Sequence, residues 1–167
     1  MKRTPIPWIL LPGLYVVFFI LLAVSAAHLP VTMATHFGLT GRPNDWMSRS
    51  GYLGMMVAFG LFFPLFVVGL SYVSRFFPDQ CQNIPRREYW LAAGKREETF
   101  DYLVQHSLWF ACLALGFVMG IHLLVVAANT GSQHGLSTAG IFGLAAVFLA
   151  GTIGWGITML RHFQHDY

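Results

Sequence analysis

Four long apolar segments recur along the chain, and they constrain its fold more than any other feature. They cover residues 8–28, 51–75, 103–128 and 138–160. Each is close to the roughly 20 residues that a helix needs to cross a hydrocarbon core about 30 Å thick. Backbone amides inside lipid must be hydrogen-bonded within their own segment, so spanning segments of this length form helices. The sequence therefore predicts an all-α integral membrane protein, a four-transmembrane-helix bundle in a single membrane domain over residues 1–167.

The composition excludes the main alternative, a soluble helical domain. Only 10% of the 167 residues are charged and 56% are hydrophobic, whereas about 25% of a soluble domain is charged. The first apolar run, from Trp8 to Ala27, is also longer than the usual 7–15-residue core of a signal peptide. We therefore expect this run to be a membrane anchor.

The lysines and arginines divide unevenly between the two sides of the predicted bundle. Eight of the ten belong to the side that holds both termini and the connection 76–102, and only Arg42 and Arg49 belong to the other. Loops rich in Lys and Arg stay in the cytoplasm. Both termini are therefore predicted to be cytoplasmic, in a multi-pass protein of the inner (plasma) membrane, with the loop 29–50 outside. The net charge of +3 follows these boundaries and shows no aromatic-interleaved basic surface, so no nucleic acid partner is expected.

The outer loop 29–50 is unusually rich in Gly, Pro, His and Trp for a linker. Gly41 and Pro43 favour a tight turn, and Trp46 suits the headgroup zone of a bilayer. Asp45 can accept hydrogen bonds from turn amides or pair with Arg42 or Arg49. Two interpretations stay open, a cap over the helix ends and a recognition surface for a ligand or partner. The candidate binding residues are Thr35, His36, Phe37, Gly41, Pro43, Asp45 and Trp46.

The cytoplasmic connection holds two arginines next to two aromatic residues, namely Arg86, Arg87, Tyr89 and Trp90. Aromatic rings anchor at headgroups and cations meet anionic lipid, so this pattern favours an interfacial lipid contact. A docking surface for a cytoplasmic partner is the alternative.

Small residues at helical spacing mark two of the predicted helices. Gly116 and Gly120 form a GxxxG pattern, and a similar row follows at Gly143, Ala146, Ala150 and Gly154. Small residues let helices approach closely in lipid. The pattern favours packing within the chain, with contact to another subunit as the alternative.

The sequence carries no motif of a known catalytic site, and we expect no enzymatic activity, no catalytic residue, no cofactor and no metal site. His28, His36, His122 and His134 could share the outer half of the membrane, but no pair has a metal-binding spacing. His122 lies inside the third apolar segment. Such a residue either serves a function in the bundle interior or hydrogen-bonds a neighbouring helix. Cys81 and Cys112 are expected to be unpaired.

Two motifs resemble a known family. Thr35-His36-Phe37, Gly41, Pro43 and Asp45-Trp46 resemble the signature of a bacterial membrane domain of unknown function, which also forms the N-terminal part of the sporulation-delaying-protein immunity family. Asn83-Ile84-Pro85 with Tyr89-Trp90-Leu91 is similar to a segment of small members with this architecture. The sequence departs from the family pattern at Gly38, Asn44 and Arg49. The resemblance implies a bacterial membrane domain and no defined activity.

These observations lead to two functional expectations of different classes. The first is a non-enzymatic small integral membrane protein whose outer loop binds or senses an unknown ligand. The second is an accessory structural subunit of a larger membrane protein complex. A membrane enzyme or metal-binding protein ranks third. The expected partners are the lipid bilayer and other membrane protein subunits.

Overall fold

The structure, a computed structural model, describes residues 5–131 and 135–164. Its elements are α1 (Ile6–Ala26), β1 (Thr32–Phe37), β2 (Pro43–Ser48), α2 (Arg49–Val73), the 3₁₀ helices η1 (Ser74–Phe76) and η2 (Asp79–Cys81), α3 (Arg87–Trp90), α4 (Arg96–Thr130) and α5 (Thr138–Gln164). The described residues contain four helices long and apolar enough to cross a membrane, α1, α2, α4 and α5. This confirms the prediction of a multi-pass, predominantly helical membrane protein.

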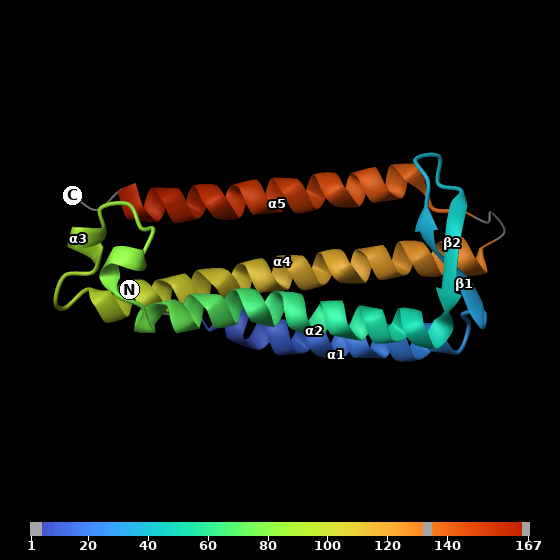
Figure 1. Ribbon diagram of the computed structural model, residues 1–167, viewed down its shortest axis with the longest axis horizontal. Helices are drawn as coiled ribbons and strands as arrows, with labels where there is room; N and C mark the ends of the chain where they lie inside the picture. The colour runs from blue at the N-terminus through green and yellow to red at the C-terminus, as the bar shows by residue number, and fades with distance from the viewer. Residues whose placement is uncertain (1–4, 132–134, 165–167) are drawn as a thin grey trace.

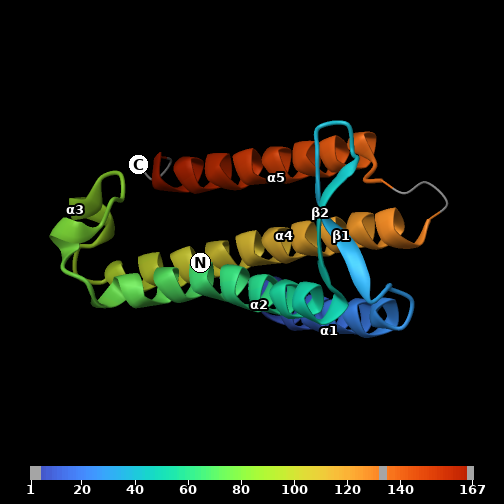
Figure 2. The ribbon, with the colours of Figure 1, turned by 45° about the vertical axis from the view of Figure 1, so that its right-hand side comes forward.

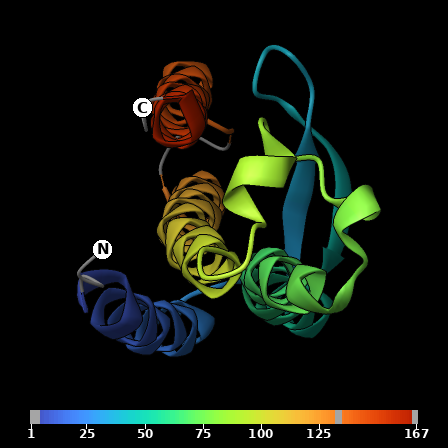
Figure 3. The same cartoon turned by 90° about the vertical axis from the view of Figure 1, so that its left-hand side faces the viewer.

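The four long helices run side by side, with α4 in the middle (Figures 1 and 3). Helices α1 and α2 both pack against α4, and α5 packs along α4 on the side away from them. The strands β1 and β2 lie at one end of the helices, and α3 lies at the other. The arrangement is therefore a three-helix unit of α1, α2 and α4 with α5 added to the outer face of α4.

Helix α4 is longer than the apolar segment that predicts it. It begins at Arg96 and ends at Thr130, whereas the apolar run begins at residue 103. At 1.5 Å per residue its 35 residues span about 52 Å, well beyond a hydrocarbon core of about 30 Å. The charged first two turns therefore belong to the helix but are not needed to cross a hydrocarbon core, which hydropathy alone does not reveal.

The loop between the first two long helices forms a β-hairpin, which the sequence did not predict. Strands β1 and β2 are antiparallel, with Met33 opposite Met47 and Ala34 opposite Trp46. The register then shifts before His36 pairs with Asp45. The turn closes with the Gly38 N–H donating to the Arg42 carbonyl at 2.8 Å. Pro43 is the first residue of β2, a place where its missing N–H is tolerated.

A buried polar network joins the three-helix unit directly below the hairpin. His122 on α4 is 1% exposed; its Nε2 lies 2.9 Å from Ser25 Oγ on α1, and its Nδ1 lies 2.9 Å from the Tyr52 hydroxyl on α2. Ser25 donates its own proton to the Leu22 carbonyl at 3.0 Å. A neutral imidazole has one donor and one acceptor nitrogen, so His122 uses both of them between Ser25 and Tyr52. His122 thus hydrogen-bonds neighbouring helices, the second of its two expected roles.

Helix α5 is joined to α4 by close packing and by a reciprocal hydrogen-bond pair. His106 Nε2 donates to the Trp155 carbonyl at 2.9 Å, and Trp155 Nε1 donates to the His106 carbonyl at 2.9 Å. Their rings also stack, with centroids 4.8 Å apart. A Cβ on Gly151 would come within 2.9 Å of the Leu113 side chain, so the glycine permits this approach.

Candidate functional site

The side chain of Asn129, at the last turn of α4, hydrogen-bonds the hairpin to that helix. The Asn129 side-chain amide donates to the Ala34 carbonyl at 2.9 Å, and its oxygen accepts from the Ala34 N–H at 2.8 Å. The amide thereby pairs with the free edge of β1 as a neighbouring strand would. Met33 and Ala34 are buried at this contact. The sequence reasoning missed Asn129, although an amide at the end of an apolar run was the available signal.

Arg49 fixes the other end of the hairpin to α1. Its guanidinium donates to the carbonyls of Ala26 at 3.1 Å and Leu29 at 3.0 Å, and its backbone N–H donates to Val31 at 2.9 Å. The last carbonyls of a helix have no partner within the helix, so a cation there satisfies them. Arg49 is therefore not paired with Asp45, one of the pairings considered from the sequence.

The tip of the hairpin touches the segment just before α5 through backbone atoms (Figure 2). The Leu136 N–H donates to the Gly41 carbonyl at 2.9 Å. Gly41 has φ +76°, and a Cβ there would collide with the Leu136 carbonyl. Both facts explain why glycine occupies this position. The hairpin is thus held by α1, α4 and α5 together.

Several predicted binding residues lie on the hairpin with exposed side chains. Trp46 is 56% exposed, and its backbone N–H donates to Asp45 Oδ1 at 2.8 Å. His36 Nδ1 lies 3.8 Å from Asp45 Oδ2 and 3.5 Å from Thr35 Oγ1. These contacts leave an imidazole, a carboxylate and an indole facing outward on a fixed backbone. Such a set can donate and accept hydrogen bonds and offer an aromatic face to a ligand.

Two further predicted residues, Phe37 and Gly41, line a pocket between the hairpin tip and α5. Its volume is about 280 Å³, and its lining is mostly apolar. The described residues around it are Phe37, Gly38, Leu39, Gly41, Leu136, Thr138, Ile141, Phe142 and Ala145. Pro43 faces Phe37 across the two strands. The outer-loop candidates therefore split between an exposed polar set and an apolar pocket.

The predicted cytoplasmic interface residues lie around α3, and one of them faces inward. Trp90 is 6% exposed, and its indole N–H donates to the Phe163 carbonyl of α5 at 3.3 Å. Arg86 donates to the Gln164 carbonyl at 3.3 Å and Arg87 to the Gln80 carbonyl at 3.1 Å. Tyr89 is 42% exposed. Trp90 therefore packs against the end of α5 instead of presenting its ring to headgroups.

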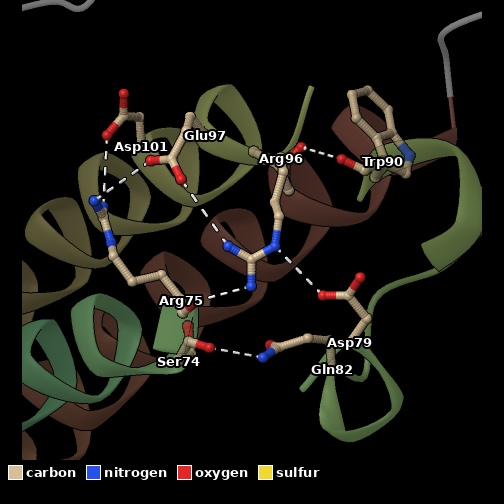
Figure 4. A network of polar contacts seen from close by, with 9 residues as sticks. Ser74, Arg75, Asp79, Gln82, Trp90, Arg96, Glu97 and Asp101 are labelled. Carbon is tan, nitrogen blue, oxygen red and sulfur yellow. Dashed lines mark hydrogen bonds and ion pairs between the residues drawn. The ribbon is translucent and has the colours of Figure 1, made fainter. Parts of the chain in front are cut away.

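Ion pairs next to α3 hold the end of α2 against the start of α4 (Figure 4). Arg75 lies 3.5 Å from Asp101 and 3.9 Å from Glu97. Arg96 lies 3.4 Å from Asp79 and donates to the Arg75 carbonyl at 2.8 Å. The charged groups of these two arginines therefore make contacts that stabilise the fold at this end of the molecule.

The two glycines of the GxxxG pattern have different surroundings. A Cβ on Gly120 would lie 2.6 Å from Leu144 of α5, so Gly120 packs within the chain. Gly116 is exposed, and a Cβ there would meet no described atom within 4 Å. In the same way, Gly143 and Gly154 of α5 face open space among the described residues.

The described residues bring together no group of three His, Cys, Asp or Glu side chains that could hold a metal ion. His134 lies outside them. Both ring nitrogens of His122 are used by Ser25 and Tyr52. Cys81 is exposed and Cys112 is buried, and both are free thiols.

The fold and the hairpin define the class, a multi-pass membrane protein with four candidate spanning helices and a β-hairpin at one end. Within it, residues 13–68 match the family model described as Domain of unknown function (DUF1648). The match covers about a third of the chain: most of α1, the hairpin and most of α2. It confirms the predicted domain of unknown function. The link to the immunity family and the Asn83–Leu91 motif stay predictions. No curated protein and no solved structure matches the chain.

Proposed function

We propose that this protein is a non-enzymatic membrane protein whose hairpin binds or senses a ligand at the outer face. The observation that carries the proposal is the contrast between the hairpin's backbone and its side chains. The backbone is fixed by Asn129, Arg49 and Leu136, whereas His36, Asp45 and Trp46 remain exposed. A rigid support with outward polar and aromatic groups lowers the entropic cost of binding. A cap needing only to cover helix ends would not require those side chains.

The orientation is part of the same proposal. Arg75, Arg86, Arg87, Lys95, Arg96 and Arg161 belong to the α3 side of the molecule, against Arg42 and Arg49 on the hairpin side. Lys2 and Arg3, which also entered the count, lie outside the described residues. The positive-inside rule then places α3 in the cytoplasm and the hairpin outside the inner membrane.

Native mass spectrometry of the protein purified in mild detergent tests the binding role. We expect the chain without a stoichiometric protein partner, carrying a small-molecule adduct that is lost in His36→Ala and Trp46→Ala. Both side chains are exposed, so thermal unfolding should stay unchanged. An adduct that survives both substitutions, or wild-type protein with no adduct, would contradict the proposal.

The alternative function, an accessory subunit of a larger complex, has one specific observation in its favour. The small residues Gly143, Ala146, Ala150 and Gly154 are all exposed along α5, and Gly116 is exposed on α4. Gly116→Leu and Gly120→Leu form a matched pair. A subunit role predicts that Gly116→Leu reduces co-purification of a partner with the fold intact, whereas Gly120→Leu disturbs the contact of α4 with α5. Equal behaviour of the two variants would count against a partner at Gly116.

A further inference from the structure

The pocket between the hairpin tip and α5 has features that identify the class of its ligand. Of the nine described residues around it, Thr138 alone has a polar side chain, and none is charged. An apolar cavity of about 150 Å³ holds benzene, so about 280 Å³ has room for about ten to twelve carbon atoms. This is the size of part of an alkyl chain, and the lining offers few groups to a polar solute.

The position of the pocket indicates where that chain comes from. The pocket extends along α5 from Thr138 to Ala145, which is about 10 Å of helix. Thr138 is the first residue of this candidate spanning helix, so the pocket lies at the end of the helix that we expect near a membrane boundary. Phe142, which lines it, is 66% exposed. Exposed apolar side chains of a spanning helix face lipid, so the pocket borders acyl chains rather than water.

A positively charged residue follows one of the residues that line the pocket. Arg42 is exposed in the turn next to Gly41, which lines the pocket, and is one of two arginines on this side of the molecule. A cation at the headgroup level meets lipid phosphate favourably. We infer that the pocket binds one acyl chain of an anionic phospholipid from the leaflet on the hairpin side, with the phosphate at Arg42. This inference goes beyond the proposed function, because the pocket is lined by none of His36, Asp45 and Trp46.

Photolabelling in nanodiscs tests the inference. The probe is phosphatidylglycerol with a diazirine in its acyl chain, added at rising mole fraction to phosphatidylcholine, and the label is mapped by peptide mass spectrometry. Labelling of residues 141–145 is expected to saturate at low mole fraction. Labelling of the exposed α1 residues Val16 and Ile20, which face bulk lipid, is expected to rise in proportion to the probe.

Two matched substitutions on neighbouring residues separate the pocket from bulk lipid. Ala145→Trp fills the pocket and should reduce its saturable labelling about tenfold, equivalent to about 1.4 kcal/mol. Ala146→Trp, on the exposed side of the same turn, should leave it unchanged. If Ala145→Trp does not fold, Leu39→Ser changes a pocket wall that is 95% exposed, and weaker saturable labelling is again expected. Arg42→Gln should shift saturation to a higher mole fraction.

The inference would be overturned if labelling of the pocket did not saturate and if Ala145→Trp or Leu39→Ser left that labelling unchanged. Saturation with phosphatidylcholine probe alone, unaffected by Arg42→Gln, would overturn the phosphate contact. The proposed binding function has a separate readout. If native mass spectrometry finds an adduct that depends on Trp46 while the pocket does not saturate, the function stands and this inference fails.

Discussion

Gly41 shows how one residue can link two elements through backbone atoms alone. Its positive φ and the nearby Leu136 carbonyl leave no place for a side chain. The sequence singled out Gly41 as a turn former, which is correct. The partner, Leu136 just before α5, could not be predicted, because residues 41 and 136 are far apart in the chain and no pattern connects them.

The first prediction concerns Gly41→Ala. A left-handed backbone costs a residue with a Cβ about 1–2 kcal/mol, and here the Cβ also meets Leu136. We expect a lower unfolding temperature in detergent and faster amide hydrogen exchange at Leu136. Gly38→Ala is the control, since its Cβ would lie 3.8 Å from the Arg42 carbonyl oxygen, an ordinary van der Waals distance. Equal unfolding temperatures for the two variants would contradict this explanation of Gly41.

The second prediction concerns the hydroxyl of Tyr52. Tyr52→Phe keeps the ring but removes the hydrogen bond to His122 Nδ1, leaving that buried ring nitrogen without its partner. Interhelical hydrogen bonds in membranes contribute about 0.6 to 1.7 kcal/mol. The free energy of unfolding in mixed micelles should fall by an amount in this range.

Tyr72→Phe serves as the matched control for Tyr52→Phe, because the Tyr72 side chain is 50% exposed and its ring contacts with Phe76 and Arg75 are kept. The role assigned to the His122 network fails if the two substitutions change stability equally.

At the scale of elements, the hairpin is the part that the sequence did not predict. Its strands are short, and the Gly, Pro and His residues that mark a functional loop also hide the strand pattern. The long helices were predictable because apolar length alone defines a membrane span. The ends of these helices were less predictable. Helix α4 begins at Arg96 because its polar first turns are held by ion pairs with Arg75 and Asp79.

The third prediction is that Asn129 carries the contact between the hairpin and α4. Asn129→Leu removes both hydrogen bonds to Ala34 and leaves a buried backbone N–H and carbonyl unpaired. Each unpaired group costs about 1–3 kcal/mol. Amide hydrogen exchange in β1 should therefore accelerate strongly, while the buried residues of α1 should exchange at the same rate as before.

The control for Asn129→Leu is Thr130→Val. The exposed Thr130 hydroxyl bonds only within its own helix in the contacts described, to the Val126 carbonyl. Unchanged protection of β1 in Asn129→Leu would show that other contacts hold the hairpin.

At the scale of the whole molecule, α5 is attached at three levels. Its start meets the hairpin at Gly41, its middle pairs with α4 through Trp155, and its end receives the indole N–H of Trp90. The sequence predicted four spanning helices but not their order around α4, since small residues occur on both the packed and the exposed faces of α5. The same ambiguity holds on α4, where Gly116 and Gly120 share one GxxxG pattern but only Gly120 packs against α5.

The proposed function depends on the proposed orientation, with the hairpin on the outer side of the membrane and α3 on the cytoplasmic side. The native cysteines allow a direct measurement with a membrane-impermeant maleimide on intact cells. Cys81 is exposed on the α3 side, Cys112 is buried, and Leu39→Cys in a Cys81→Ser background places a thiol at the hairpin tip. The proposed orientation predicts that Leu39→Cys is labelled in intact cells, whereas Cys81 is labelled only after permeabilisation. Labelling of Cys81 in intact cells, with Leu39→Cys protected until permeabilisation, would contradict it.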